Sequence, residues 1–78
     1  MSLDLGGIHL NDVKALENLT QLEELDLRSN QLTDVKGLEK LTKLKMLRLE
    51  NNPDLTKAQI AELQKALPNC KILSNFTK

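Results

Sequence analysis

The sequence has almost no aromatic residues and only one cysteine. Its 78 residues include one phenylalanine and neither tyrosine nor tryptophan, so a binding surface built on large aromatic anchors is excluded. A single cysteine cannot form an internal disulfide, and the chain therefore lacks the cross-links expected of a small secreted domain. We expect a cytoplasmic protein; the alternative is a surface or secreted fragment whose signal sequence has been removed.

Net charge and long apolar runs are also missing. Eleven lysines and arginines balance eleven aspartates and glutamates, which removes the usual electrostatic argument for a nucleic acid or an anionic membrane as partner. No apolar run approaches the roughly 18 residues of a membrane span, and the first residues lack the basic start and apolar core of a signal peptide. We therefore expect neither a nucleic-acid partner nor a membrane partner.

Leucine dominates the composition, with 18 of the 78 residues. A step of 22 residues superimposes the chain on itself, because Leu22–Asn30 and Leu44–Asn52 both read LxxLxLxxN. Leu3-Asp4-Leu5 matches the middle of the same pattern, so the chain begins inside an earlier unit. After a slip of one residue, Leu67–Asn75 is interpreted as a further copy, with Cys70 in its second leucine position.

This pattern resembles the leucine-rich repeat family, and the resemblance covers essentially the whole chain. The units are similar to the short 22-residue subclass, and the tail from Leu55 to Ile72 resembles the terminal unit of bacterial members. The resemblance implies an α/β fold, a right-handed solenoid of about three and a half units with a short parallel sheet on its concave face. A C-terminal α-helix and a capping strand complete one domain, residues 1–78, interpreted as the C-terminal end of a longer array.

Alternation of side chains within each LxL segment predicts one short strand per unit, with leucines toward the core and polar residues outward. The strands are expected near residues 3–5, 24–27, 46–49 and 70–73. The resemblance further implies a ladder of asparagines whose amides bond backbone groups of adjacent turns, formed by Asn30, Asn52 and Asn75. Ile8 occupies the corresponding position in the first unit and departs from the pattern.

The segments between the strands predict short helical pieces. Apolar residues spaced by three favour 3₁₀ turns in the first two units. In the last unit, Thr56 and Gln59 fit a capping box, which predicts an α-helix over residues 57–67 that Pro68 ends. Phe76 is expected to fold over the open C-terminal end of the core, since repeat proteins need a cap.

Catalytic, metal-binding and cofactor-binding patterns are not found. The chain has no Gly-x-Ser-x-Gly motif and no glycine-rich phosphate loop. His9 and Asp12 offer two ligands from one turn, which do not make a closed metal site. Cys70 is interpreted as a packing residue, because Lys71 points to the opposite face of the same strand. The sequence therefore predicts a protein that is not an enzyme and that needs no cofactor.

The concave face is the usual interaction surface of repeat arrays. Arg48, Met46 and Leu73 are the expected anchors of a partner, and Asp4 and Gly6 lie at the edge of the face. Asp26 is expected beside Arg48, and Arg28 beside Glu50, so that opposite charges partly neutralise one another across the strands. The full set of expected partner-binding residues is Glu24, Asp26, Arg28, Met46, Arg48, Glu50, Asn69, Lys71 and Leu73.

Two functions remain open at this point. The first is a non-catalytic interaction module that binds a protein partner, of unknown identity, through the concave sheet. The alternative is a structural or self-assembling segment that associates through its N-terminal end, where Leu3, Leu5, Ile8 and Leu10 form an apolar surface beside an unpaired strand edge.

Overall fold

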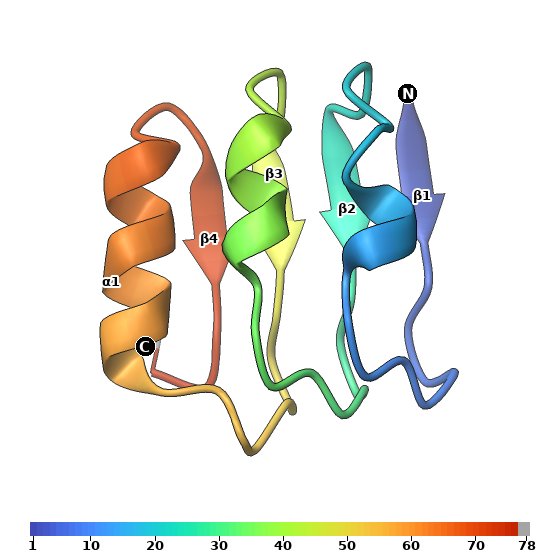
Figure 1. Cartoon of the computed structure of the whole chain (residues 1–78), viewed down its shortest axis with the longest axis vertical. Coiled ribbons are helices and arrows are strands. Elements are labelled where there is room, and N and C mark those ends of the chain that lie inside the picture. Colours follow the sequence, from blue (N-terminus) through green and yellow to red (C-terminus); the bar gives the residue numbers. More distant parts are fainter. Residues whose placement is uncertain (77–78) are drawn as a thin grey trace.

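Four short parallel strands form the sheet of the computed structural model, which describes residues 1–76 (Figure 1). They follow the chain in the order β1-β2-β3-β4, with bounds Ser2–Asp4, Glu24–Asp26, Met46–Arg48 and Lys71–Leu73. Between them lie two 3₁₀ helices, η1 (Lys14–Leu16) and η2 (Lys36–Lys40), and one α-helix, α1 (Lys57–Ala66). The predicted α/β solenoid is confirmed, and the strand positions agree with the prediction to within about one residue.

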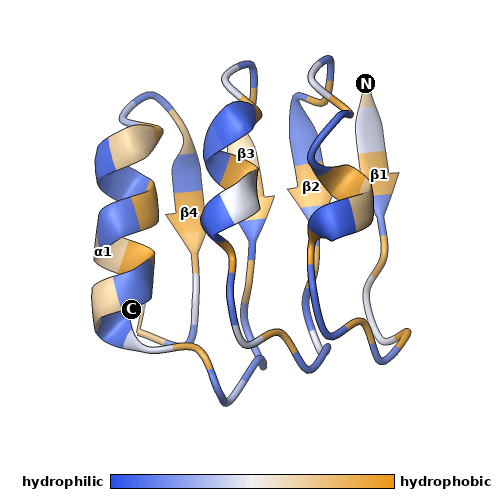
Figure 2. Ribbon diagram, viewed as in Figure 1, coloured by the Kyte–Doolittle hydropathy of each residue, from blue (hydrophilic) through white to orange (hydrophobic). Residues whose placement is uncertain are grey.

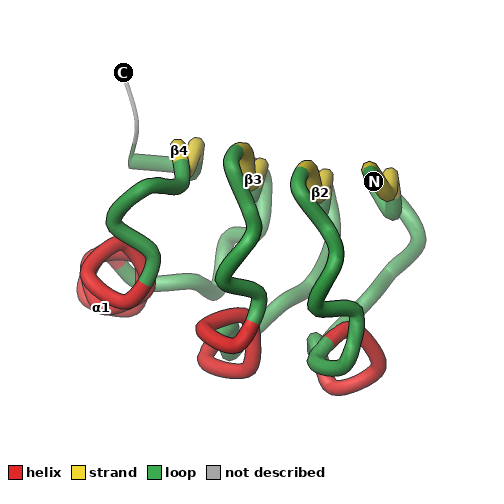
Figure 3. Tube along the Cα trace, turned by 90° about the horizontal axis from the view of Figure 1, so that it is seen from above, coloured by secondary structure: helices red, strands yellow, loops and turns green. Residues whose placement is uncertain are grey.

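The strands and helices form two layers. Figure 3 shows the four strands along one side and the helical segments along the other, with the strands closer together than the helices. The sheet therefore lines the inner side of the curve, which we call the concave face. This curvature follows from the bulk of each unit, because a helical turn needs more space than an extended strand.

Leucines fill the space between the layers. Leu25, Leu27, Leu47 and Leu49 are at most 1% exposed, and they belong to one continuous apolar cluster that runs through all the units. Figure 2 shows apolar residues within every strand of the solenoid. The first unit is less covered, since Leu3 is only partly buried against this cluster. A single unit buries little surface, so the core exists only because the units stack.

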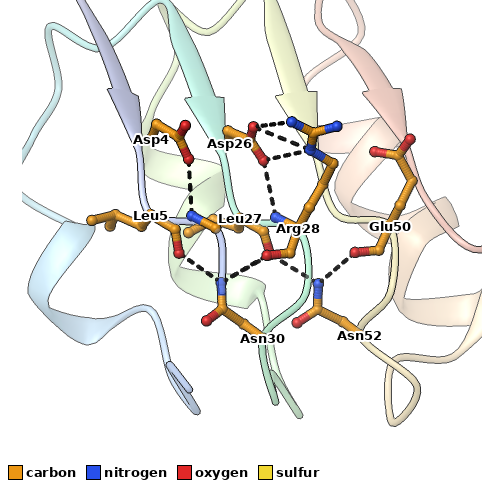
Figure 4. Close-up of polar contacts among 9 residues, drawn as sticks. Asp4, Leu5, Asp26, Leu27, Arg28, Asn30, Glu50 and Asn52 are labelled. Atoms are coloured by element: carbon orange, nitrogen blue, oxygen red, sulfur yellow. Dashed lines mark hydrogen bonds and ion pairs between the residues drawn. The ribbon is translucent and has the colours of Figure 1, made fainter. Parts of the chain in front are cut away.

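Buried asparagines tie each unit to the one before it. The side chain of Asn52 is fully buried; its Nδ2 donates to the carbonyls of Leu27 and Leu49, at 3.0 Å each, and its Oδ1 accepts from the Leu32 N–H at 3.2 Å. Asn30 repeats the arrangement one unit earlier, donating to the carbonyl of Leu5 at 2.9 Å. Figure 4 shows both amides bridging neighbouring turns. The first two members of the predicted ladder are confirmed.

The residue before each of the first three ladder positions has a positive φ. The values are 71° at Gly7, 58° at Ser29 and 60° at Asn51, and these three positions are one 22-residue repeat apart. Glycine and asparagine tolerate this left-handed conformation, whereas serine is strained in it. The repeat therefore encodes a sharp turn that leads the chain from the sheet into the convex layer.

Helix α1 begins as the sequence predicts. The Thr56 hydroxyl accepts from the Gln59 N–H at 3.2 Å, and the Gln59 side chain accepts in return from the Thr56 N–H at 2.9 Å. Leu63 is buried against the core. The helix ends at Ala66, with Leu67 as its C-cap, one residue earlier than predicted.

The register of the last strand differs from the sequence interpretation. The pattern places Cys70 opposite Leu47, but in the structure Ile72 is the partner of Leu47, so that interpretation is wrong by two residues. The physical reason is the path of the chain after α1. The Leu67 carbonyl accepts from the Cys70 N–H at 3.1 Å, just as the Leu41 carbonyl accepts from the Leu44 N–H. Leu67 therefore closes the convex segment, and Cys70 takes the core position that precedes the strand.

The C-terminal end agrees with one further expectation and contradicts another. Asn75 donates to the Asn52 carbonyl at 3.0 Å and accepts from the Asn51 N–H, so it bonds backbone groups of the preceding turn as the ladder predicts, although it is exposed. Phe76 is 45% exposed, more than a side chain that closes the core. Helix α1 and strand β4 cover this end of the core instead.

Replacing Asn52 by alanine should destabilise the protein by about 3 kcal/mol, because it removes the donor to two carbonyls and leaves the buried Leu32 N–H without an acceptor. Asn75→Ala is the matched control and should cost less than about 1 kcal/mol, since the side chain is exposed. Urea denaturation measures both values. Equal losses for the two variants would contradict the register described for β4.

Candidate functional site

The concave face is organised in rows that cross the strands. Strand pairing places Ser2, Glu24, Met46 and Lys71 in one row, and Asp4, Asp26, Arg48 and Leu73 in the next. Two residues further along each chain segment come Gly6, Arg28 and Glu50. Since alternate residues of a strand share a face, these side chains point away from the leucine core.

Asp26 and Arg28 form an ion pair along their own strand. Arg28 Nη2 lies 2.8 Å from Asp26 Oδ2, and Arg28 Nε lies 3.0 and 3.1 Å from the two carboxylate oxygens (Figure 4). The hydrogen bonds from the Arg28 side chain hold the pKa of the Asp26 carboxyl below its usual range. Both oxygens of this carboxylate are therefore occupied by a guanidinium of the same strand.

This pair replaces the cross-strand ion pairs that the sequence analysis expects. Asp26 does lie beside Arg48, as predicted, but among residues 1–76 the Arg48 guanidinium makes no hydrogen bond and no ion pair within 4.0 Å. An ion pair between Arg28 and Glu50 is likewise not formed, although Glu50 adds a weaker attraction that raises the pKa of Arg28. Arg48 is thus a partly buried residue whose guanidinium forms no ion pair with residues 1–76, although its charge attracts Asp26 at longer range.

Arg48 borders a hollow of about 280 Å³ in the centre of the face. The walls come from three strands, β1, β2 and β3, and the apolar side chain of Met46 lies at one side of it. A second hollow adjoins the first at Asp4 and Asp26, where Gly6 and Gly7 carry no side chains. The concave face therefore has two adjoining hollows, whose linings include the charged residues Asp4, Asp26 and Arg48.

Glu50 has an unusual environment on this face. Its Oε1 atom is buried and receives no hydrogen bond, and no dashed line reaches the carboxylate in Figure 4. Burial of a polar atom without a partner costs free energy, and such atoms in native proteins require an explanation. The carboxylate lies on the same face as Arg28, whose guanidinium is already held by Asp26.

The residues expected near β4 divide into two groups. Lys71 is exposed beside Met46, and Leu73 is partly buried beside Arg48, so both lie on the concave face. Asn69 does not: it precedes β4 in a turn and lines a different hollow with Thr42, Leu44 and Leu67. Its assignment to the partner-binding surface therefore stays a prediction. Ser2 is a member of the face that the sequence analysis leaves out.

The described residues offer little for covalent or metal chemistry. Within residues 1–76, no group of three or more His, Cys, Asp or Glu side chains is placed to hold a metal ion. Cys70 is 4% exposed, and burial raises the pKa of its thiol, so it packs as a core residue. None of the helices in this part of the chain is long and apolar enough to cross a membrane.

Comparison with known proteins shows to which family the chain belongs. A family model described as leucine-rich repeats in two copies matches residues 2–40 and again residues 20–65. The chain belongs to the leucine-rich repeat family. A solved structure of a leucine-rich repeat protein from Leptospira interrogans is similar, with a TM-score of 0.65 and 34% sequence identity over 73% of this chain. The matched region spans only 14% of that protein's chain. No curated protein matches the sequence.

Membership in this family indicates a general kind of function. Leucine-rich repeats are, in general, non-catalytic modules for protein–protein interaction. The similarity to a bacterial leucine-rich repeat protein agrees with the bacterial character of the C-terminal segment. In repeat proteins, the concave face that this sheet forms is the usual interaction surface.

The ion pair between Asp26 and Arg28 predicts how the stability of the protein depends on pH. Because the folded-state pKa of Asp26 is depressed, its contribution to stability is present above the ordinary pKa and is lost as pH falls through the lower folded-state value. Arg28→Met should raise the pKa of Asp26 toward its ordinary value of about 3.9. Arg48→Met, the control, should raise it less, because Arg48 acts only through its charge. Carbon-13 NMR of the carboxyl groups measures both, and equal shifts would contradict the pairing.

Proposed function

We propose that this leucine-rich repeat segment is a non-catalytic module that binds a protein partner through the concave face. The proposal rests on the surroundings of Arg48. The residue is partly buried and borders the central hollow, and its guanidinium has no counter-charge within 4.0 Å among residues 1–76. A guanidinium without a close counter-charge is available to form a bidentate, charge-assisted pair with a carboxylate that a partner supplies.

The neighbours of Arg48 support the same surface. Met46 and Leu73 are partly buried apolar side chains beside it on β3 and β4, and methionine adapts its shape to a partner. Arginine is enriched among the residues that dominate binding energies. The face has no tryptophan or tyrosine, so we expect modest affinity from these four strands alone.

A pull-down with the 78-residue chain from the cells of origin, followed by identification of the captured protein, tests this proposal. Arg48→Glu should weaken capture of that protein by about tenfold or more, since it replaces the anchor cation by a repelling charge. The matched control is Lys57→Glu, which makes the same charge change on an exposed residue of α1 in the convex layer. If both variants capture the partner as well as the wild type, the concave face is not the binding surface.

The alternative function has one specific observation in its favour. Strand β1 is an edge of the sheet, and near it Met1 and Ile8 are 62% and 52% exposed. An open edge next to apolar side chains is suited to association with another strand. In the same experiment, light scattering of Ile8→Glu distinguishes the two functions: self-association that is lost in this variant, with capture unchanged by Arg48→Glu, favours the assembly role.

A further inference from the structure

Charge is divided between the two halves of the concave face. Strands β1 and β2, with the residues that follow them, carry three carboxylates, Asp4, Glu24 and Asp26, against the single cation Arg28, a net charge of −2. Strands β3 and β4 carry Arg48 and Lys71 against Glu50, a net charge of +1. The chain as a whole is neutral, so this division is a property of the face and not of the composition.

The acidic half lacks one cation. Asp4 and Asp26 are direct neighbours on adjacent strands, an arrangement of like charges that is destabilising unless it is compensated. Arg28 compensates Asp26. Within residues 1–76, Asp4 accepts a hydrogen bond only from the Gly6 N–H, at 2.9 Å, and Arg28 attracts it only at longer range. Glu24 is exposed and forms no ion pair with residues 1–76. A cation from outside the described chain would therefore be attracted to Asp4 and Glu24.

The basic half lacks an anion. Arg48 lies beside Asp26, but the two oxygens of that carboxylate already accept three hydrogen bonds from the Arg28 side chain. Lys71 is exposed and likewise has no ion pair with residues 1–76. Since a guanidinium binds a carboxylate through two parallel hydrogen bonds, Arg48 is suited to receive an acidic side chain.

The two halves meet at one hollow. The lining of this hollow includes Asp4 from β1, Glu24 from β2, and both Met46 and Arg48 from β3. Asp4 and Arg48 are two strands apart, which is about 10 Å at the usual strand spacing. In an extended peptide, side chains on the same side recur about every 7 Å. A peptide that crosses the sheet would thus reach both charges with residues two or four positions apart.

Resting on the function proposed above, we propose that the partner presents an extended segment in which a basic side chain contacts Asp4 and Glu24 while an acidic side chain pairs with Arg48. The two charged residues are separated by two or four positions, so that both side chains face the sheet. This assignment pairs Asp4 and Glu24 of the acidic half and Arg48 of the basic half with a single ligand that needs no net charge of its own.

Selection of phage-displayed random twelve-residue peptides on the immobilised chain tests this inference. We expect enriched peptides to carry Lys or Arg two or four positions from Asp or Glu. Arg48→Glu should select peptides without the acidic residue, and Glu24→Lys peptides without the basic one, whereas Lys57→Glu should select the wild-type pattern. For a synthetic copy of an enriched peptide, either reversal on the face should weaken binding about tenfold. Circular dichroism confirms that each variant is folded.

The outcomes separate this inference from the function on which it rests. Enriched peptides without paired charges, whose binding is nevertheless lost in Met46→Arg, would overturn the inference and leave the concave face as the binding surface. Peptides that bind equally well to Arg48→Glu, Glu24→Lys and Met46→Arg would overturn both. If no peptide is enriched over the uncoated support, an extended segment is not the ligand, and the inference is wrong.

Discussion

The buried amide of Asn52 is the interaction on which the rest of this structure depends. Strands of three residues make few hydrogen bonds of their own, and where the chain turns away from the sheet it leaves carbonyl and N–H groups far from water. One amide satisfies groups of two successive units, because it bonds Leu27, Leu32 and Leu49. Asn30 bonds the same Leu27 carbonyl from the other side. The two amides therefore fix the distance and the register between units, and with them the alignment of every outward side chain.

Alignment of the outward side chains gives the concave face its chemistry. Because Asp26 is held by Arg28 along its own strand, Arg48 on the next strand remains without a close partner among residues 1–76. The binding properties proposed for this face thus follow from one ion pair, in a chain whose overall charge is zero.

Much of the fold could be predicted from the sequence, because a 22-residue period places equivalent residues of successive units beside one another in the stack. Leu25, Leu47 and Asn52 have positions that only one alignment of the two central repeats allows. The last unit was harder, since Leu67–Asn75 satisfies the pattern in the wrong register. The true register depends on Leu67 serving as the C-cap of α1, which is a tertiary property. The direction of the Arg28 side chain was equally hidden, because Asp26 and Glu50 are both within reach of a long, flexible side chain.

Native-state hydrogen exchange of the Leu32 amide tests most directly the claim that buried asparagines join the units into one cooperative structure. This N–H bonds only to the side chain of Asn52 among the bonds described for it. If the claim is right, it exchanges with the free energy of global unfolding measured by urea, as do the amides of Leu27 and Leu49 in the sheet. Exchange of Leu32 through a local opening of much lower free energy, with the sheet amides still protected, would contradict it.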